Sequence, residues 1–387
     1  MNTELLKCFA PIHNVLLFLG SSRLKIKNNM IAPSTRYQKL YALCCIFVVT
    51  LSFSYIQLYY YLTYYHEDTT IYVCYAIGIV VQNVSYLSHT IFARFLDVES
   101  SVKLCQNLQK VDNILRLKQF KRYNEQQYYW NVVVLVFIIT SFECGFLVHI
   151  WYTVEYPILA FFAGIGLLNV YMELVLAASL IVYLAIRLKF LNKIAHHNLK
   201  IKGYYNNTRA AIAVDEHLLI NSDVKDANID LGNFLICMKE ILKMYQHITQ
   251  VFSFPVLNIA TTVFIWTLLV MLTVVVGFCT KPLSLVMIIT VSLLCVFYLA
   301  LLTMVALVSD YFIKQVRKTK LYCIHAMSRR FEGPIWKGAN EILKTIDFYQ
   351  PSFSVFGIFI LNKTLPLTII GLITTNLAIL IQFTMQV

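Results

Sequence analysis

Charged side chains are scarce in this chain of 387 residues. Asp, Glu, Lys and Arg together make up 13% of it and hydrophobic residues 59%, whereas a soluble chain is typically about 25% charged and about 45–50% apolar. So few charges cannot cover the surface of a soluble fold, and a soluble fold is therefore excluded. The mean hydropathy of +0.66 instead indicates a membrane protein.

Sequence motifs for catalysis and metal binding are also lacking. There is no glycine-rich phosphate loop, no HExxH and no CxxC. The adjacent His196 and His197 cannot share one helix face, as metal ligands four residues apart would. The sequence therefore predicts no catalytic residue, no metal site and no cofactor, and it does not support an enzyme.

Seven long apolar runs are present. A helix that crosses about 30 Å of hydrocarbon needs roughly 20 mostly apolar residues, and each run is long enough. An eighth apolar stretch, Ser352 to Leu361, is too short, and we expect it to form a buried or re-entrant piece. The sequence predicts an all-α integral membrane protein with seven transmembrane helices, at residues 40–64, 71–93, 131–153, 157–186, 253–279, 283–308 and 364–384.

The basic residues are distributed unevenly among the connections. Of the 32 Lys and Arg residues, 31 lie before the first run or in the connections 94–130, 187–252 and 309–363, and only Lys281 lies elsewhere. Lys and Arg are enriched in cytoplasmic loops, so this pattern predicts a cytoplasmic N-terminus and an extracellular C-terminus. The net charge of +12 then reflects topology, and no nucleic-acid partner is expected.

The same pattern divides the chain into four segments. We expect a cytoplasmic N-terminal segment at 1–39, in which Phe9 to Gly20 forms an interfacial helix. Residues 40–308 carry the first six transmembrane helices with long cytoplasmic helical connections. Residues 309–363 form a further cytoplasmic connection, and residues 364–387 contain the seventh helix.

A few polar side chains fall within the apolar runs. Two of them are carboxylates, and a charge at that depth costs about 2.5–3.5 kcal/mol on insertion scales. At 1.5 Å per residue, six residues form one layer about 15–24 Å below the outer surface. Such a layer suits a small polar ligand; the alternative is that these side chains only hydrogen-bond between helices. The six candidates are Gln82, Asn83, Glu143, Asn169, Glu173 and Trp266.

In the seventh run, Thr, Gly, Ile and Gln residues recur at steps of three or four, which keeps them on one helix face. We call this set the mixed stripe. Such side chains cannot all face lipid at low cost. Around an axis shared by several copies, the stripe would line a narrow cation path with two amide rings and one apolar ring. The alternative is a helix packed within its own bundle. The stripe consists of Thr368, Gly371, Thr375, Ile379, Gln382 and Gln386.

The C-terminal run resembles a known signature. Thr375 to Phe383, TNLAILIQF, is similar to the insect gustatory receptor signature TYhhhhhQF, in which h is apolar, with Asn376 in place of the Tyr. Upstream, a short segment resembles the one that leads into the family's last helix. The length, the seven runs and the long cytoplasmic connections are similar too. The residues of that upstream segment are Gly357, Phe359, Leu361, Leu365 and Gly371.

This resemblance implies a function. Insect gustatory receptors, like insect odorant receptors, are tetrameric, ligand-gated, non-selective cation channels of the plasma membrane, found in sensory neurons. Four copies of the last helix would line the pore, and a cytoplasmic anchor that includes 348–361 would hold a homotetramer or a heteromer with other gustatory receptors. Each subunit would bind a small tastant among spans two to six. The pore and gate residues would be Thr375, Ile379, Gln382, Phe383 and Gln386.

Several alternatives remain at this stage. The resemblance favours a bitter or unassigned tastant, with a sugar receptor or an odorant receptor as the nearest alternatives. A secondary transporter would show internal repeats and paired Gly or Pro breaks, yet Pro255, Pro282 and Pro366 lie near the ends of runs. A G-protein-coupled receptor has the opposite topology and an NPxxY motif in its last helix, which this chain lacks.

Overall fold

The described part of the protein is almost entirely helical. The structure is a computed structural model. Some side chains inside its helices, including those of 143–153, are not described. The described residues are 3–27, 30–64, 69–115, 121–153, 157–198, 231–280, 285–329 and 332–384.

Each of the seven predicted spans is a helix. Five of the helices in the described residues are long and apolar enough to cross a membrane, and the last contains a shorter apolar stretch, Leu365–Ile379. The third span falls in a helix whose side chains after Phe142 are not described. The prediction of an all-α membrane fold is confirmed. The seven helices are α2 (Arg36–Tyr64), α3 (Thr69–Ile91), α5 (Lys121–Thr153), α6 (Pro157–Asn198), α9 (Leu231–Thr280), α10 (Leu285–Arg329) and α12 (Leu365–Thr384).

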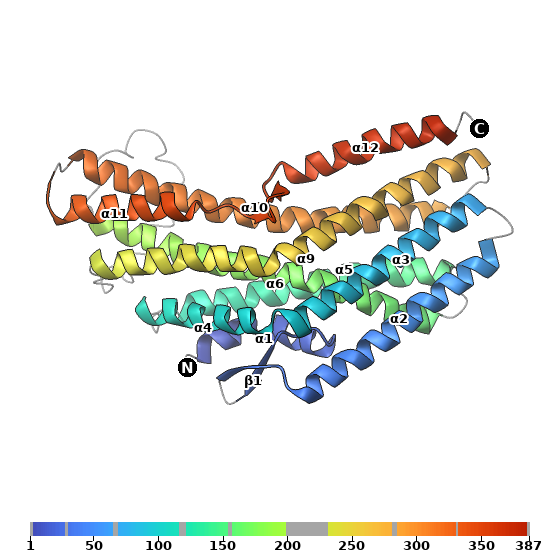
Figure 1. Ribbon diagram of the computed structural model, residues 1–387, viewed down its shortest axis with the longest axis horizontal. Helices are drawn as coiled ribbons and strands as arrows, with labels where there is room; N and C mark the ends of the chain where they lie inside the picture. Colours follow the sequence, from blue (N-terminus) through green and yellow to red (C-terminus); the bar gives the residue numbers. More distant parts are fainter. Residues whose placement is uncertain are drawn as a thin grey trace.

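The remaining elements lie between the middle of the bundle and the end at which α4 and α11 are found (Figure 1). Two short antiparallel hairpins pair β1 with β2 and β3 with β4. A π-helical turn, η1, directly continues α3. The bounds are α1 (Thr3–Phe18), β1 (Leu24–Lys27), β2 (Met30–Pro33), η1 (Phe92–Leu96), α4 (Val98–Ile114), α11 (Pro334–Tyr349), β3 (Ser354–Val355) and β4 (Phe359–Ile360).

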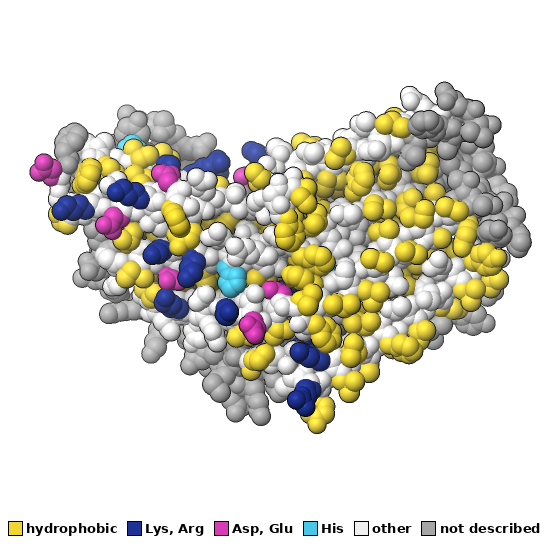
Figure 2. Space-filling view, viewed as in Figure 1, with side chains coloured by type: hydrophobic (Ala, Val, Ile, Leu, Met, Phe, Trp, Pro, Cys, Tyr) yellow, Lys and Arg dark blue, Asp and Glu magenta, His cyan; other side chains and the backbone are white. Residues whose placement is uncertain are grey.

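Three helices are far longer than a bilayer requires. α9 has 50 residues, which at 1.5 Å per residue is about 75 Å, and α6 and α10 have 42 and 45. Their extensions pack with α4 and α11 at one end. Figure 2 shows Lys, Arg, Asp and Glu side chains gathered at that end and hydrophobic side chains spread over the other. The helices therefore have a polar end and an apolar end, as a membrane protein with a large domain on one side does.

α6 is the central helix of the bundle. Of the 18 most apolar consecutive residues in its candidate span, 78% are buried, whereas the corresponding share in α2 is 28%. Two glycines permit close helix packing in the bundle, one in α6 and one in α3. A Cβ on Gly166 of α6 would lie 2.4 Å from Val49 Cγ1 of α2, and a Cβ on Gly78 of α3 would lie 2.3 Å from the Trp266 ring of α9. Because α6 contacts most of the other spans, it sets their arrangement.

The N-terminal helix packs on the bundle. We expected an interfacial helix at Phe9 to Gly20; the helix α1 covers most of this stretch and packs against α5 and α6. Its Cys8, Ile12 and Leu16 lie at i, i+4 and i+8 and are almost fully buried. The helical extensions thus offer this apolar face a protein surface that hydropathy alone does not reveal, and the interfacial position of the helix stays a prediction.

The short apolar stretch before the last helix forms the β3–β4 hairpin. Phe353, Val355 and Leu361 are fully buried, and β3 packs on α9. Two residues with positive φ, Phe356 at 49° and Gly357 at 74°, form the turn, which the Ile358 N–H closes by donating to the Val355 carbonyl over 2.9 Å. The expectation of a buried piece is confirmed for one face of the hairpin.

Candidate functional site

The mixed stripe lies on the open side of α12. Its first three members, Thr368, Gly371 and Thr375, are exposed, as are Ile379 and Gln382. A Cβ on Gly371 would meet nothing within 4 Å. The side chain of Phe383 and all of Gln386 lie outside the described residues. Every described member of the stripe therefore faces away from the rest of its own chain.

The apolar side of α12, unlike the stripe, packs against the rest of the chain. Leu365, Ile369 and Ile373 are buried, and the helix packs on α9 and α10. At 3.6 residues per turn, the centre of the stripe lies about 120° around the helix from the centre of this packed side. The alternative in which the stripe packs within its own bundle is thus wrong for the described residues.

The polar groups of α12 bond partly to their own helix. The Thr375 hydroxyl donates to the Gly371 carbonyl over 2.9 Å, and the Thr368 hydroxyl to the Thr364 carbonyl over 3.2 Å. Asn376, which replaces the signature Tyr, donates its amide to the Leu372 carbonyl over 2.7 Å. These bonds lower the cost of placing Thr and Asn in an apolar helix, so the stripe stays compatible with a membrane span.

Within the bundle, Glu173 of α6 is ion-paired to the N-terminal segment. The carboxylate is fully buried, and Arg23, which follows α1, approaches it with Nη2 at 3.0 Å and Nε at 3.1 Å from Oε2. Arg23 Nη1 also lies 2.6 Å from Asp97 Oδ2, and His89 Nε2 lies 3.9 Å from Glu173 Oε1. One guanidinium thus pairs with two carboxylates, of which Glu173 is fully buried and Asp97 is 11% exposed.

This pairing changes the interpretation of Glu173. The sequence places Glu173 in the layer of candidate ligand residues, and it indicates for Arg23 only a cytoplasmic position. In the structure the carboxylate is engaged by Arg23 inside the protein, which favours the alternative of bonding between segments for this residue. Burial raises the pKa of the neighbouring Asp97, and Arg23 opposes that rise. The sequence signalled that Glu173 needs a partner, but no pattern indicated which of the 32 cations it is.

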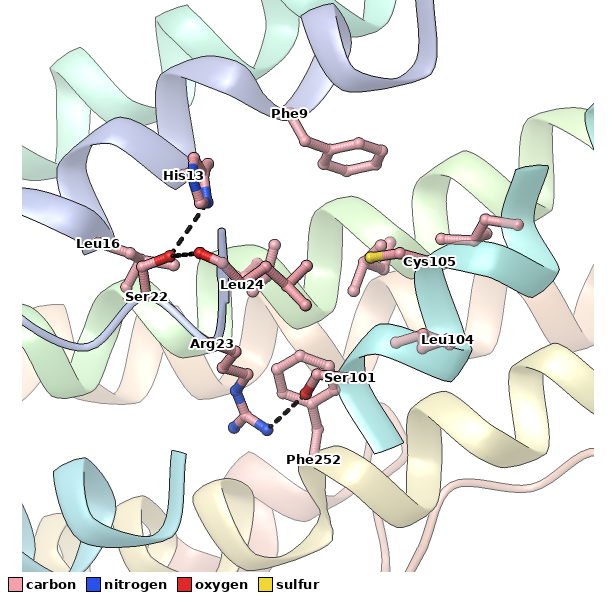
Figure 3. A pocket seen from close by; sticks show the side chains of 13 residues that line it. Phe9, His13, Leu16, Ser22, Arg23, Leu24, Ser101, Leu104, Cys105 and Phe252 are labelled. Atoms are coloured by element: carbon pink, nitrogen blue, oxygen red, sulfur yellow. Dashed lines mark hydrogen bonds between the residues drawn. The ribbon is translucent and has the colours of Figure 1, made fainter. Parts of the chain in front are cut away.

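A cavity lies beside this ion pair (Figure 3). It has a volume of about 80 Å³, and α1, α4, α6 and α9 line it mainly with apolar side chains. His13 and Ser22 face each other at one side, with 3.1 Å between Nδ1 and Oγ, and Arg23 reaches toward Ser101 at another. Burial and then Arg94 lower the pKa of His13. None of the six candidate ligand residues is among the described residues that line it.

The other candidate ligand residues occupy two helix contacts. Trp266 of α9 lies against Gly78 of α3, and Gln82, one turn further along α3, is also buried. Asn169 of α6 is fully buried and donates to the Thr90 hydroxyl over 3.3 Å. Asn83 lies half-buried beside Gln82, with its Oδ1 buried. The side chain of Glu143 lies outside the described residues, so the layer is described only in part.

A second buried ion pair ties the helical extensions together. Arg187 of α6 lies 3.3 Å from Asp112 of α4, measured from Nε to Oδ1, and donates from Nη2 to Asn124 of α5 over 2.7 Å. The Tyr183 hydroxyl donates to the same Asp112 carboxylate. From the sequence, Arg187 was used only as one of the cations that predict the topology.

Among the described residues, no group of three or more His, Cys, Asp or Glu side chains could hold a metal ion.

Comparison with known proteins gives two kinds of match. A family model described as "7tm Chemosensory receptor" matches residues 9–387. The insect olfactory receptor OR5 from Machilis hrabei has a similar structure, with a TM-score of 0.65, 11% identity and 97% of each chain covered. The same receptor in complex with eugenol also matches, with a TM-score of 0.65, 13% identity and 98% of each chain covered. No curated protein matches the chain.

Proposed function

Because the chain belongs to the 7tm chemosensory receptor family, we propose that it is a taste receptor that opens a non-selective cation channel on binding a small molecule. The observation that carries this proposal is the exposed polar stripe of α12. In the proposed assembly, four subunits surround an axis in the plasma membrane of a sensory neuron, as a homotetramer or with other gustatory receptors. The N-terminus is cytoplasmic and the C-terminus extracellular.

The stripe supports a pore because it has no partner surface among the described residues of its own chain. Thr, Gly and Gln facing lipid are unfavourable, whereas the same residues facing a shared water-filled axis are solvated. Thr375 and Gln382 would contribute polar rings along that axis, and Ile379 between them an apolar ring that closes by dewetting. Phe383 and Gln386 extend the proposed gate toward the C-terminus, by position in the sequence.

Exposed apolar side chains near the β3–β4 hairpin support a multi-subunit assembly. Phe348, Phe356, Ile358 and Ile360 are more than half exposed, Phe348 at 80%. They lie in the segment 309–363, whose basic residues favour a position outside the membrane. Contiguous apolar surface in such a region marks a protein interface. We assign these side chains to an anchor in which they are buried against the neighbouring subunits.

The ligand is proposed to be a small organic molecule bound between α3, α6 and α9. That the related olfactory receptor is described with eugenol supports a ligand of this size. The buried Trp266, Gln82 and Asn169 offer an aromatic face and amides, to which Asn83 and Glu143 add. Because Glu173 is engaged by Arg23, fewer polar groups remain for a sugar, which favours a more apolar, bitter compound.

Recording from cells tests the proposed function. The chain is expressed alone in a cell line without other chemoreceptors, and sugars, alkaloids and plant glycosides are applied. We expect at least one compound class to evoke a cation current that persists when G proteins are blocked, because the channel and the ligand site lie in one protein. A current that disappears on G-protein block, with the receptor present at the surface, contradicts the channel proposal.

A further inference from the structure

An open groove runs along the bundle between α5 and α10, and α6 forms its floor. Its volume is about 590 Å³. Trp130 and Val134 of α5 form one wall, Met304 and Tyr311 of α10 form the other, and Val182 is part of the floor. Most of its lining side chains are apolar, so the groove suits a hydrocarbon chain better than water. The amides of Gln127 and Asn131 on the α5 wall hydrogen-bond to each other.

An aromatic cluster closes one end of this groove. Tyr171 of α6 stacks on Tyr298 of α10 with 4.8 Å between ring centroids, and Phe142 of α5 lies 5.5 Å from Tyr171 and 5.8 Å from Phe297. The groove begins at Val175, one turn beyond Tyr171. The three helices therefore meet at this cluster, and the groove lies on the side of it toward the end of α6.

The length of the groove matches one leaflet of a bilayer. From Val175 to Ile186 the floor rises by 11 residues, or about 16 Å, close to half of the roughly 30 Å hydrocarbon core. Lys189 and Lys193, which also line the groove, lie a further 5–11 Å along, at the depth of the headgroups. Trp130 and Tyr311 are partly exposed, as aromatic residues at a membrane interface are.

We propose that this groove binds an anionic phospholipid of the cytoplasmic leaflet. An acyl chain fills the apolar part below the aromatic cluster, and the phosphate lies against Lys189 and Lys193. These lysines are one helical turn apart, so both reach one headgroup. Each also interacts within the protein, but an ammonium group has three N–H donors and can bind a phosphate in addition. The bound lipid would bridge α5 and α10 where the two helices diverge.

Lipid retention by the purified full-length receptor tests this assignment. The receptor is exchanged into nanodiscs with equal amounts of phosphatidylglycerol and phosphatidylcholine, and the lipids that remain after mild extraction are counted by native mass spectrometry. Because each lysine near an anionic surface adds a similar increment of binding energy, K189Q/K193Q should weaken phosphatidylglycerol retention about 10- to 30-fold. The matched control K103Q/K318Q removes two exposed lysines outside the groove and should retain the lipid as the unmodified receptor does.

A second variant separates the groove from its charge. Val182→Trp fills the floor of the groove and leaves both lysines in place, so it should also lose the retained phosphatidylglycerol. Equal retention of the two lipids by the unmodified receptor, or equal loss in K189Q/K193Q and the control, overturns the proposal. If Val182→Trp fails to fold, the comparison of the two lysine pairs still tests the proposal, because Gln has nearly the same helix propensity as Lys.

Discussion

Receptors with Gln382→Ala should respond to the same ligand concentrations as the unmodified receptor but conduct a different current. Gln382 is exposed on the open side of α12, where four copies would form a ring of amides around permeating ions. If an amide contributes about 1 kcal/mol to solvating an ion at the narrowest point, its loss should change single-channel conductance or the sodium-to-potassium permeability ratio about fivefold. Single-channel recording and bi-ionic reversal potentials measure both.

Asn376 supplies a matched control for this change. It is also an amide on α12, but it lies toward the packed side and donates to the Leu372 carbonyl. Asn376→Ala should therefore leave conductance and ion selectivity unaltered. A Gln382→Ala receptor with unaltered conductance and a displaced dose–response curve would place Gln382 in ligand binding and would contradict its position in the pore.

Arg23→Ala should destabilise the receptor more than any surface change. It leaves Glu173 fully buried without its cation, and removing one partner of a buried ion pair costs about 3–5 kcal/mol. The exposed pair of Lys110 with Glu240, at 3.0 Å, is the control, since breaking an exposed pair costs about 0–1 kcal/mol. Thermal unfolding of the detergent-solubilised receptor, followed by size-exclusion chromatography, should show a large loss for Arg23→Ala and little for Lys110→Ala.

The companion variant Glu173→Gln distinguishes the two interpretations of Glu173. A neutral amide removes the buried negative charge while Arg23 keeps Asp97 as a partner, so the loss of stability should be smaller than for Arg23→Ala. Variants that reach the surface should keep the dose–response curve of the unmodified receptor. A displaced dose–response curve without loss of stability would show that Glu173 contacts the ligand. That is the role predicted for it from its depth in the fourth span.

The sequence was sufficient for the spans and for the stripe, and the reason is periodic hydrophobicity. Long apolar runs need no knowledge of neighbours, so the helices at α2, α3, α6, α9 and α10 follow directly from them. The spacing of Thr375, Ile379 and Gln382 also fixes one helix face. Which way that face points depends on the packing of α12 on α9 and α10, and no local pattern contains that information.

The partners of buried charges could not be predicted for a similar reason. Arg23 and Glu173 are 150 residues apart, and both Arg23 and Arg187 look like ordinary cytoplasmic cations in the sequence. Depth in a span located Glu173, Asn169 and Trp266 but not what each contacts. The contacts of α1 could not be predicted either, because the helical extensions that give its apolar face a partner come together only once the chain is folded.

Thiol modification during recording tests the central claim, that the stripe of α12 lines the ion path. Thr375→Cys and Gln382→Cys lie on the stripe, and Ile370→Cys lies about 140° around the helix at an exposed position. The unmodified receptor, with its ten cysteines, gives the baseline. We predict that a charged methanethiosulfonate reagent, applied outside during ligand-evoked current, blocks both stripe variants and spares Ile370→Cys and the unmodified receptor. Block of Ile370→Cys with both stripe variants unaffected would contradict the account.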